Sequence, residues 1–371
     1  MWTQQQYNIH FQKIRHVYVK LDWLNWNENK VDEIQGKLID GNVNINAESA
    51  IRRTCNLTFE IISNNKLLPS PTSCVWLNYK FRLWIGLKDL LTDEIVWFNK
   101  GIYLLNKPSV NYSLTGKTIS LEGYDKMCWY DGTLNGEMTN PLIIPVGTDI
   151  NNAIKSVVQT YGETKFNMDL INKTTPYTIE KQAGDTYYNV LKELCDLYAG
   201  WEIFFDENGW FVYRQIKDGI SDPIVWDFSQ TDLTVNYQNE PDFQNVKNHI
   251  QIWGTLHDDG TQIKYTIENN DANSPFNIDK IGRRDLTIID ENIYTNEQAQ
   301  ARAEYELKKH SNLNEKINIS CLPIYYLDVN NAVYFNNSEV GISGKYLITN
   351  ISLPLKYDGI MSFDAYKIYD I

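Results

Sequence analysis

Hydrophobic and polar residues alternate along much of the first third of the chain. The alternation is regular over 15–23, 42–46 and 54–62, where every second residue is apolar. A period of two residues is typical of β-strands that bury one face. Apolar runs at 81–87 and 95–98 extend the strand-like character of this region. These segments predict an all-β domain of roughly 110 residues, the size of a small sandwich or barrel.

A helical pattern replaces the alternation after Gly132. Apolar residues recur at helical spacing over 150–161 and over 187–198, with Thr148 and Asp185 as the candidate N-cap residues. Residues 201–213 then form a predicted β-hairpin with an Asn-Gly turn, which is a strong local signal. This middle region is therefore expected to be a compact α+β unit.

The last third returns to strand-like patterns, interrupted by one predicted helix at 295–310. Thr295 and Gln298 have the spacing of a capping box, in which each side chain accepts a hydrogen bond from the other residue's backbone. We expect the helix to pack on the β-domain that surrounds it. The side chains expected at that contact are Ala299, Ala303 and Leu307.

The order of these regions predicts three domains. A first β-domain spans 1–132, an inserted α+β domain spans 133–224, and a second β-domain with one helix spans 225–371. The fold class is thus mainly β with an α+β insert, in which two β-barrel or sandwich domains flank a small α+β domain. A chain of 371 residues is long enough for two or three domains.

A strand–turn–strand pattern occurs twice, at 101–116 and at 344–359. Gly101, Tyr103 and Gly116 each have an identical residue 243 positions later, as do Leu104 and Ser109. Chance is one explanation, because tyrosine and leucine are common in strands. A true repeat at this spacing indicates two copies of one β-domain. In that case Tyr103 and Tyr346 occupy equivalent places, and Gly116 and Gly359 lie in the two turns.

Composition and charge narrow the function classes. The 24 Tyr and 11 Trp favour strands, and the formal net charge of −13 argues against tight binding to phosphate backbones. Cys55 and Cys195 lie in apolar patterns, and the five cysteines form no CxxC pair, so buried free thiols are expected. The sequence begins without a signal-peptide pattern, and no apolar run approaches the ~18 residues of a membrane span.

The sequence shows no motif with catalytic, cofactor-binding or metal-ligating spacing. Gly116-Lys117-Thr118 resembles the end of a P-loop, but Asn111 stands where the first glycine belongs and the segment lies in a predicted hairpin. The five histidines have neither a partner four residues away nor a neighbouring cysteine, and there is no G-x-S-x-G elbow. We therefore predict no catalytic, cofactor or metal residues and no enzyme activity. His257 beside Asp258 and Asp259 is expected to be a solvated turn.

Some residues leave alternatives open. Arg52-Arg53 and Arg283-Arg284 either contact acidic residues at an interface or face solvent. Carboxylate pairs on turns, such as Asp206/Glu207, do not exclude a glycosidase, which needs two carboxylates facing each other. Several tryptophans could stack on sugars, although core packing is the commoner explanation. These are Trp84, Trp97, Trp129, Trp201, Trp210 and Trp226.

Several segments resemble baseplate hub proteins of phage tails and phage-tail-like particles of low-GC Gram-positive bacteria. The opening of that family is similar to residues 36–43 and 51–54, and its later β segments are similar to 84–87 and 97–103. Its middle domain is similar to residues 184–209. The resemblance covers most of the chain, and its motifs are turns and strands rather than chemistry. It therefore carries over no catalytic residues.

The resemblance implies a fold of two tail-tube-like β-domains around a smaller insert, and it implies a homotrimer. Two tube domains per chain would place six around the axis, so the ring would be a symmetry adaptor between the six-fold tail tube and the three-fold central spike. The implied partners are the tube or tube-initiator protein, the spike, the baseplate wedges and the tape-measure protein. DNA would only pass through the lumen, and the acidic balance fits such a passage.

The resemblance also implies a location in the virion tail baseplate, or in a phage-tail-like particle, assembled in the bacterial host cytoplasm. No cofactor, membrane or sequence-specific DNA contact is implied. The competing function is a tail-associated module that binds or hydrolyses cell-wall glycan.

Overall fold

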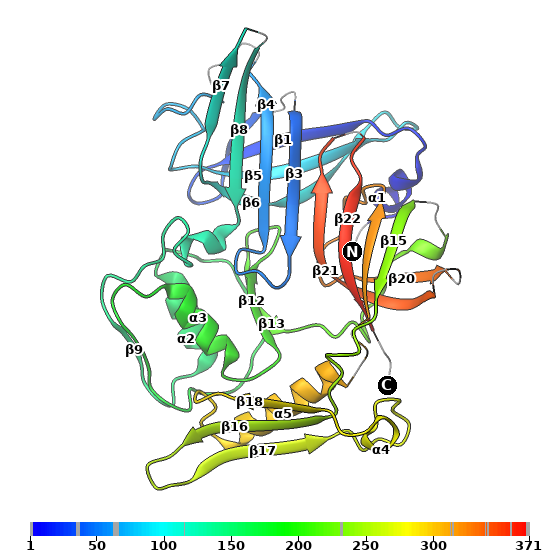
Figure 1. Cartoon of the computed structure of the whole chain (residues 1–371). Coiled ribbons are helices and arrows are strands. Elements are labelled where there is room, and N and C mark those ends of the chain that lie inside the picture. Colours follow the sequence, from blue (N-terminus) through cyan, green and yellow to red (C-terminus); the bar gives the residue numbers. More distant parts are fainter. Residues whose placement is uncertain are drawn as a thin grey trace.

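The computed structural model describes residues 3–34, 38–61, 67–114, 116–230, 233–311, 313, 315–337, 339, 341–356 and 358–368. Two β halves lie side by side at the top of Figure 1, with the first half in blue and cyan and the second in orange and red. A green α+β unit lies below them, and a yellow unit with its own helix lies at the bottom (Figure 1). Gly36 and Lys37, which belong to the family resemblance, fall outside the described residues.

One 14-stranded sheet contains strands from both β halves. Its main path has the order β15-β19-β22-β21-β3-β4-β8-β6-β5-β1-β2, while β7 pairs with β8 and β20 pairs with β14 and β21. The first half supplies β1 Val17–Leu24, β2 Lys30–Ile34, β3 Leu38–Asn46, β4 Arg53–Glu60, β5 Lys80–Lys88, β6 Ile95–Leu105, β7 Ser109–Ser113 and β8 Gly116–Tyr124. The second half supplies β14 Ile224–Asp227, β15 Thr234–Glu240, β19 Lys316–Cys321, β20 Ala332–Asn337, β21 Ile342–Pro354 and β22 Met361–Lys367.

The alternation in the sequence corresponds to one buried and one open face of these strands. Val19, Leu21 and Trp23 of β1 are buried, as are Cys55 and Leu57 of β4. The two halves share a single buried cluster, because residues of both belong to it. Short helices lie beside this sheet, namely α1 Gln4–Asn8, η1 Ile9–Phe11, η3 Lys126–Trp129 and η4 Phe228–Gln230.

The middle unit has its own core between two helices and short strands. Its elements are β9 Leu142–Ile144, α2 Ile150–Gln159, β10 Phe166–Met168, β11 Ile179–Lys181, α3 Tyr187–Asp196, β12 Trp201–Phe205 and β13 Phe211–Gln215. Helices α2 and α3 are the two helices predicted for this region, but each N-cap residue lies one position later than expected. Asp149 caps α2 by accepting from the Asn152 N–H, and Thr186 caps α3 by accepting from the Asn189 N–H.

The predicted helix at 295–310 is α5 Asn296–His310, and the Thr295–Gln298 capping box is present. The helix does not pack on the large sheet. Ala299 and Ala303 instead contact a cluster around Ile250 and Ile252 on a separate sheet of order β17-β16-β18. The bounds of this small unit's other elements are β16 His249–Leu256, β17 Gln262–Glu268, α4 Ile278–Ile281 and β18 Asp285–Ile289. The β16–β17 hairpin has an apolar face, and α5 is the element that covers it.

Buried residues form three clusters. One joins the two β halves, one lies within 127–213, and one lies within 250–303. The domain bounds 1–132, 133–224 and 225–371 stay a prediction, with the small β16–α5 unit inside the third. Among the described helices, none combines the length and the hydropathy that a membrane crossing requires.

Candidate assembly surface

The hairpin repeat is present in the strand pairing of the two halves. Leu104 pairs with Tyr124 across β6 and β8, and Leu347 pairs with Tyr366 across β21 and β22. Beyond a one-residue irregularity, Ser109 pairs with Ser120 in the first half, just as Ser352 pairs with Ser362 in the second. The β6–β7 segment therefore corresponds to β21, with Ser109 matching Ser352, and β8 corresponds to β22, with Ser120 matching Ser362. Between β7 and β21 the residue numbers keep the offset of the repeat (352 − 109 = 243). Between β8 and β22 the offset is smaller by one (362 − 120 = 242).

The repeat extends to two further strands. Cys55 of β4 pairs with Gly123 of β8, and its counterpart Ile317 of β19 pairs with Ala365 of β22. On the outer side, β3 pairs with β4 as β15 pairs with β19. The bulge between Leu38 and Asp40 recurs between Thr234 and Asn236, at one common offset (234 − 38 = 236 − 40 = 196). Each half thus contains the same four-strand unit, β3-β4-β8-β6/β7 or β15-β19-β22-β21, with matching bulges.

Single residues in the two units are also equivalent. Tyr103 and Tyr346 are fully buried, and Gly101 and Gly344 both have positive φ, at 132° and 119°. Gly116 and Gly359 both lie at the turns, since Ser113 pairs with Gly116 and the Gly359 N–H donates to the Lys356 carbonyl. They are not counterparts, however, because the second strands differ from the offset of the repeat by one position. A Cβ on Gly116 would meet nothing within 4 Å, whereas one on Gly359 would lie 2.6 Å from Pro354.

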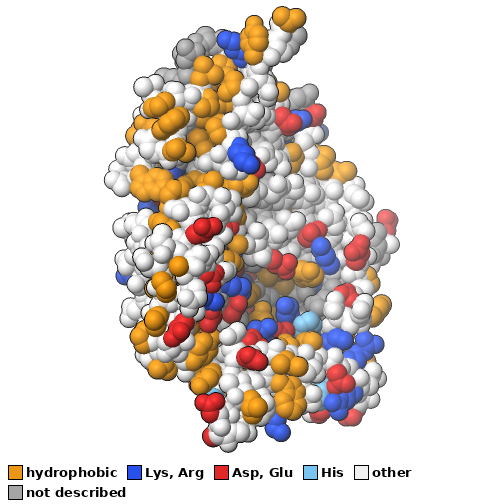
Figure 2. Space-filling view, turned by 60° about the vertical axis from the view of Figure 1, so that its left-hand side comes forward, with side chains coloured by type: hydrophobic (Ala, Val, Ile, Leu, Met, Phe, Trp, Pro, Cys, Tyr) orange, Lys and Arg blue, Asp and Glu red, His pale blue; other side chains and the backbone are white. Residues whose placement is uncertain are grey.

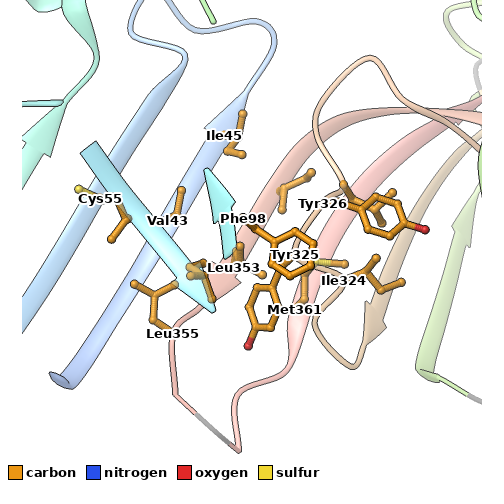
Figure 3. Close-up of a cluster of buried hydrophobic side chains, with 14 of the residues drawn as sticks. Val43, Ile45, Cys55, Phe98, Ile324, Tyr325, Tyr326, Leu353, Leu355 and Met361 are labelled. Atoms are coloured by element: carbon orange, nitrogen blue, oxygen red, sulfur yellow. The ribbon is translucent and has the colours of Figure 1, made fainter. Parts of the chain in front are cut away.

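The two units are joined edge to edge inside the chain. The end of β21 pairs antiparallel with β3, from Asn350 opposite Asn46 to Pro354 opposite Asn42. The Leu355 N–H donates to the Gly41 carbonyl at 2.9 Å, and an ion pair of 3.1 Å joins Lys356 to Asp40. Figure 3 shows the apolar side chains beneath this junction. Those of the two strands that are at most 1% exposed are Val43, Ile45, Ile351 and Leu353.

The unit pair ends in two open edges. Among the described strands, β7 pairs only with β8, and β15 pairs only with β19. All five residues of β7 are exposed, including Val110 at 41% and Tyr112 at 75%. On β15, Val235 is 61% exposed. Unpaired strand edges of this kind are templates for another chain.

The face of the ladder that points away from the core is rich in neutral amides and hydroxyls. Thr58 and Ser120 share a hydrogen bond of 3.0 Å there, and Asn318 donates to Asp364 at 2.7 Å. Acidic side chains lie among them at the same alternating positions, namely Asp40, Glu60, Glu122, Glu240 and Asp364, together with the basic Lys316. The neutral polar residues at these alternating positions are Asn42, Asn44, Asn46, Thr54, Asn56, Thr58, Ser109, Asn111, Thr118, Ser120, Gln238, Asn318, Ser320, Asn350, Ser352 and Ser362.

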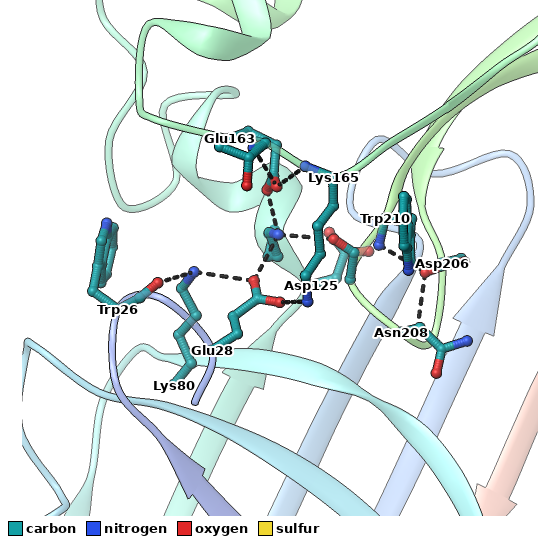
Figure 4. A network of polar contacts seen from close by, with 12 residues as sticks. Trp26, Glu28, Lys80, Asp125, Glu163, Lys165, Asp206, Asn208 and Trp210 are labelled. Atoms are coloured by element: carbon teal, nitrogen blue, oxygen red, sulfur yellow. Dashed lines mark hydrogen bonds and ion pairs between the residues drawn. The ribbon is translucent and has the colours of Figure 1, made fainter. Parts of the chain in front are cut away.

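A buried ionic network fixes the middle unit to the first β half (Figure 4). Glu28, from the β1–β2 loop, binds Lys126 at 2.7 Å, Lys165 at 2.6 Å and Lys80 at 3.2 Å. Lys126 also contacts Glu163. Burial alone would raise the pKa of Glu28, but the lysines around it, Lys126 foremost, outweigh burial and hold the pKa at about 2. The carboxylate therefore stays charged and acts as a structural tie.

The Arg52-Arg53 pair lies at an interface within the chain, so the first of its two readings is confirmed. Arg52 pairs with Glu202 of β12 at 2.6 Å, and Arg53 pairs with Asp328 of the second half at 2.5 Å. Both side chains are almost fully buried. Arg283 instead forms an exposed ion pair with Asp285. The first arginine pair thus holds the first half, the insert and the second half together.

The residues considered for chemistry lie apart. Gly116-Lys117-Thr118 begins strand β8, so no helix N-terminus follows it. Asp206 accepts hydrogen bonds from the N–H groups of Asn208 and Trp210, and Asp259 accepts from that of Thr261, as turn residues do. Within the described part of the chain, no three His, Cys, Asp or Glu side chains gather at a spacing that suits a metal ion.

The six tryptophans do not form one sugar-binding face. Trp226 is buried in the main core, and Trp201 stacks on Tyr213 in the middle unit with ring centroids 4.7 Å apart. Trp84 donates to Asp22 at 2.7 Å, and Trp97 lies under Lys20. The cysteines predicted to be buried thiols, Cys55 and Cys195, are buried and free.

Acidic and basic side chains are mixed over the face drawn in Figure 2, and the surface is hollowed near its middle. An open groove of about 1350 Å³ lies where the middle unit, the small unit and the second β half meet. Asp218, Glu304 and Lys308 are among its lining residues. The groove is wide and is lined by side chains of both charges, whereas small-molecule sites are usually concave and mostly apolar.

Comparison with known proteins shows which proteins have a similar fold. The profile of a family described as a domain of unknown function, DUF5048, matches residues 273–371. No curated protein matches the chain. Among solved structures, a tail protein from Neisseria meningitidis MC58 is similar with a TM-score of 0.64 and 13% identity, covering 94% of this chain and 96% of that one.

Two prophage proteins are similar over the same share of the chain. The 43 kDa tail protein of prophage MuSo2 from Shewanella oneidensis has a TM-score of 0.61 and 14% identity, covering 94% of this chain and 98% of its own. The prophage tail protein gp18 from Listeria monocytogenes EGD-e has a TM-score of 0.53 and 12% identity, with 94% coverage of both chains. At such low identity the likeness is one of fold, and the predicted mainly β fold shared with phage tail proteins is confirmed.

Proposed function

We propose that the chain is a structural baseplate hub that forms a trimeric, pseudo-six-fold ring between a six-fold tail tube and a three-fold central spike. The observation that carries the proposal is the repeated four-strand unit, matched strand by strand and bulge by bulge. Three chains with two equivalent units each supply six units around one axis, which is the number a six-fold partner requires.

The fold shared with phage tail proteins over nearly the whole chain supports the same proposal. A structural role also fits the distribution of charged groups, because buried charged side chains such as Glu28, Lys126 and Arg53 connect parts of the chain to one another. The partners in this proposal are two further copies of the chain, the tube or its initiator, the spike, the wedges and the tape-measure protein. The location is the tail baseplate of a virion or tail-like particle, and catalysis has no part in the function.

Native mass spectrometry of the purified full chain over a concentration series, together with electron microscopy of the parent particle, tests the proposal. We expect a trimer and a ring with six similar β units around a channel. A particle that holds one copy, or six copies in one ring, contradicts the adaptor function.

A further inference from the structure

We propose that strand β7 of one copy pairs antiparallel with strand β15 of the next copy, repeating between chains the junction that β21 and β3 form within the chain. The proposal rests on the ring of the proposed function and names the strands that close it. The counterpart of the end of β21 is β7, and the counterpart of β3 is β15. The pairing that β21 and β3 make within the chain is therefore not made by their counterparts β7 and β15, which stay at the two outer edges of the described sheet.

The internal junction fixes the register of this contact. Leu353 lies opposite Val43 within the chain. Moving each residue to its counterpart (353 − 243 = 110 and 43 + 196 = 239) places Val110 opposite Asn239. The same transfer places Asn111 opposite Gln238, Tyr112 opposite Tyr237, and Lys107 opposite Asp242. Opposite charges thus meet at one end of the contact and two aromatic rings at the other.

The backbone groups needed for this pairing are directed correctly. In the internal junction the Leu355 N–H donates to Gly41, and the Ala47 N–H donates to Thr349, each at 2.9 Å. Hydrogen-bonded pairs alternate along antiparallel strands, so Leu353 also directs its backbone at β3. The counterparts of Leu353 and Leu355 on β7 are Val110 and Tyr112.

The prolines near the two edges face each other in this register. Pro108 is the counterpart of Ile351 and Pro241 the counterpart of Ile45, which lie opposite one another in the internal junction. Proline has no N–H to donate, so a proline opposite an ordinary residue disrupts a ladder. Two opposed prolines leave no N–H donor unmatched. An edge strand carrying a proline also resists pairing with unrelated strands.

Exposure of apolar side chains supports a second copy as the occupant. Val110 is 41% exposed and Tyr112 is 75% exposed, whereas their counterparts Leu353 and Leu355 are 1% and 3% exposed. The internal junction buries the counterparts, so an equivalent junction between chains would cover β7. In Figure 1 β7 and β15 lie at opposite sides of the molecule, so one chain cannot join them to each other. A head-to-tail contact of this kind closes into a ring when its rotation permits.

Cysteine cross-linking tests the register. Asn111→Cys and Gln238→Cys are introduced together into the full chain with Cys74→Ser, because Cys74 is the native cysteine that is not buried. Residues 111 and 238 form a non-hydrogen-bonded pair in this register, whose Cα atoms lie ~4.5 Å apart and suit a disulfide. We expect mild oxidation to give a covalent ladder that ends at the trimer.

A matched control is Asn111→Cys with Asn236→Cys, two residues out of register on the same face. That diagonal separation of ~7–8 Å is beyond disulfide reach, so no ladder is expected. Tyr112→Pro provides a second measurement. It removes the N–H directed at the partner, and we expect it to abolish the trimer while thermal unfolding of the monomer stays unchanged.

The two proposals fail separately. A trimer that forms without the 111–238 cross-link, that cross-links equally in the control, or that survives Tyr112→Pro contradicts the β7–β15 pairing alone. Absence of a trimer both in solution and in the particle contradicts the hub function as well. A ladder specific to the 111–238 pair supports both.

Discussion

His10 connects the N-terminal helix to the second half of the molecule through both nitrogens of its ring. Nδ1 lies 2.8 Å from the Gln6 carbonyl oxygen, and the Tyr325 N–H donates to Nε2 at 2.9 Å. One nitrogen therefore donates and the other accepts, which only the neutral imidazole does. Burial, with the positive charges of Arg15 and Lys100 nearby, lowers the pKa of His10 to about 3. This one side chain makes the fold sensitive to acid.

The expected result is a loss of stability below pH 6.5 that depends on His10. An unfolded histidine takes up a proton near pH 6.5 and the folded one does not, so the unfolded state is favoured as the pH falls toward 3. Between pH 6.5 and pH 5 the free energy of unfolding should fall by about 2 kcal/mol more in the native protein than in His10→Gln. Urea unfolding of both proteins at the two pH values measures the difference. An equal fall in the free energy of unfolding in both proteins would show that His10 does not cause the acid sensitivity.

The repeat supplies a matched pair of glycine substitutions. A Cβ at Gly101 would lie 3.0 Å from the Tyr103 ring, whereas one at Gly344 would meet only Lys367, at 3.6 Å. Both positions have positive φ, so alanine is strained at each by roughly 1–3 kcal/mol. We expect Gly101→Ala to lower the melting temperature more than Gly344→Ala. The reverse order would mean that Tyr103 moves aside without cost.

At the scale of elements, the β1–β2 loop is held by buried charge as well as by an aromatic contact between Trp26 and Trp129. Glu28 has a positive φ of 63°, and its carboxylate meets three lysines that come from β5, from η3 and from the segment after α2. The loop therefore fixes the position of the middle unit against the first β half. Loss of its charge should loosen that contact before it unfolds either core.

Glu28→Gln should destabilise the protein by about 3 kcal/mol, because Lys80 and Lys126 then remain buried with less compensating charge. The folded pKa of Glu28, about 2, lies below its ordinary value of 4.5, so its contribution is present above pH 4.5 and is lost as the pH falls toward 2. Denaturant unfolding and limited proteolysis between the first half and the middle unit measure both effects. Exposed Lys192→Gln, at an ion pair with Asp196, is the control and should change stability little.

The elements themselves were largely predictable, because alternation and helix caps are local. The predicted N-caps were one residue too early, because at each helix start two adjacent residues both favour the N-cap position. These are Thr148 and Asp149 for α2, and Asp185 and Thr186 for α3. The sequence indicated that α5 has a closely approaching partner through Ala299 and Ala303. It did not indicate which sheet, since that depends on contacts far apart in the chain.

At the scale of the whole molecule, the two β halves are one continuous sheet with a shared core. The sequence predicted two copies of a β-domain from the hairpins at 101–116 and 344–359. It did not predict that β21 would pair with β3, because nothing local marks a strand near one end of the chain as the partner of a strand near the other. The matching bulges at Leu38/Asp40 and Thr234/Asn236 also could not be predicted from the sequence, because the two segments share little sequence.

In the assembled particle, the two four-strand units of one chain should be related by a rotation of about 60° around the ring axis, as pseudo-six-fold closure requires. A reconstruction of the particle gives this angle directly. A clearly different rotation, or units at different radii, would remove the basis for matching a six-fold tube.

The purified protein should release neither sugar nor peptide from peptidoglycan. The carboxylates considered earlier, Asp206 and Asp259, serve as turn residues rather than facing one another. Chromatography of digests, with a muramidase as the positive control, measures release. Product formation that disappears on replacing a single carboxylate would establish an enzyme instead.

The face of the ladder that points away from the core has a consequence for what moves across it. Amides and hydroxyls dominate it, and its acidic side chains, among them Glu60, Glu122 and Asp364, outnumber the basic Lys316. In a closed ring whose channel is lined by this face, a passing nucleic acid would be repelled with a strength that falls as salt rises. Passage of a nucleic acid should then become easier at higher ionic strength, whereas passage of an uncharged stretch of unfolded polypeptide should change little.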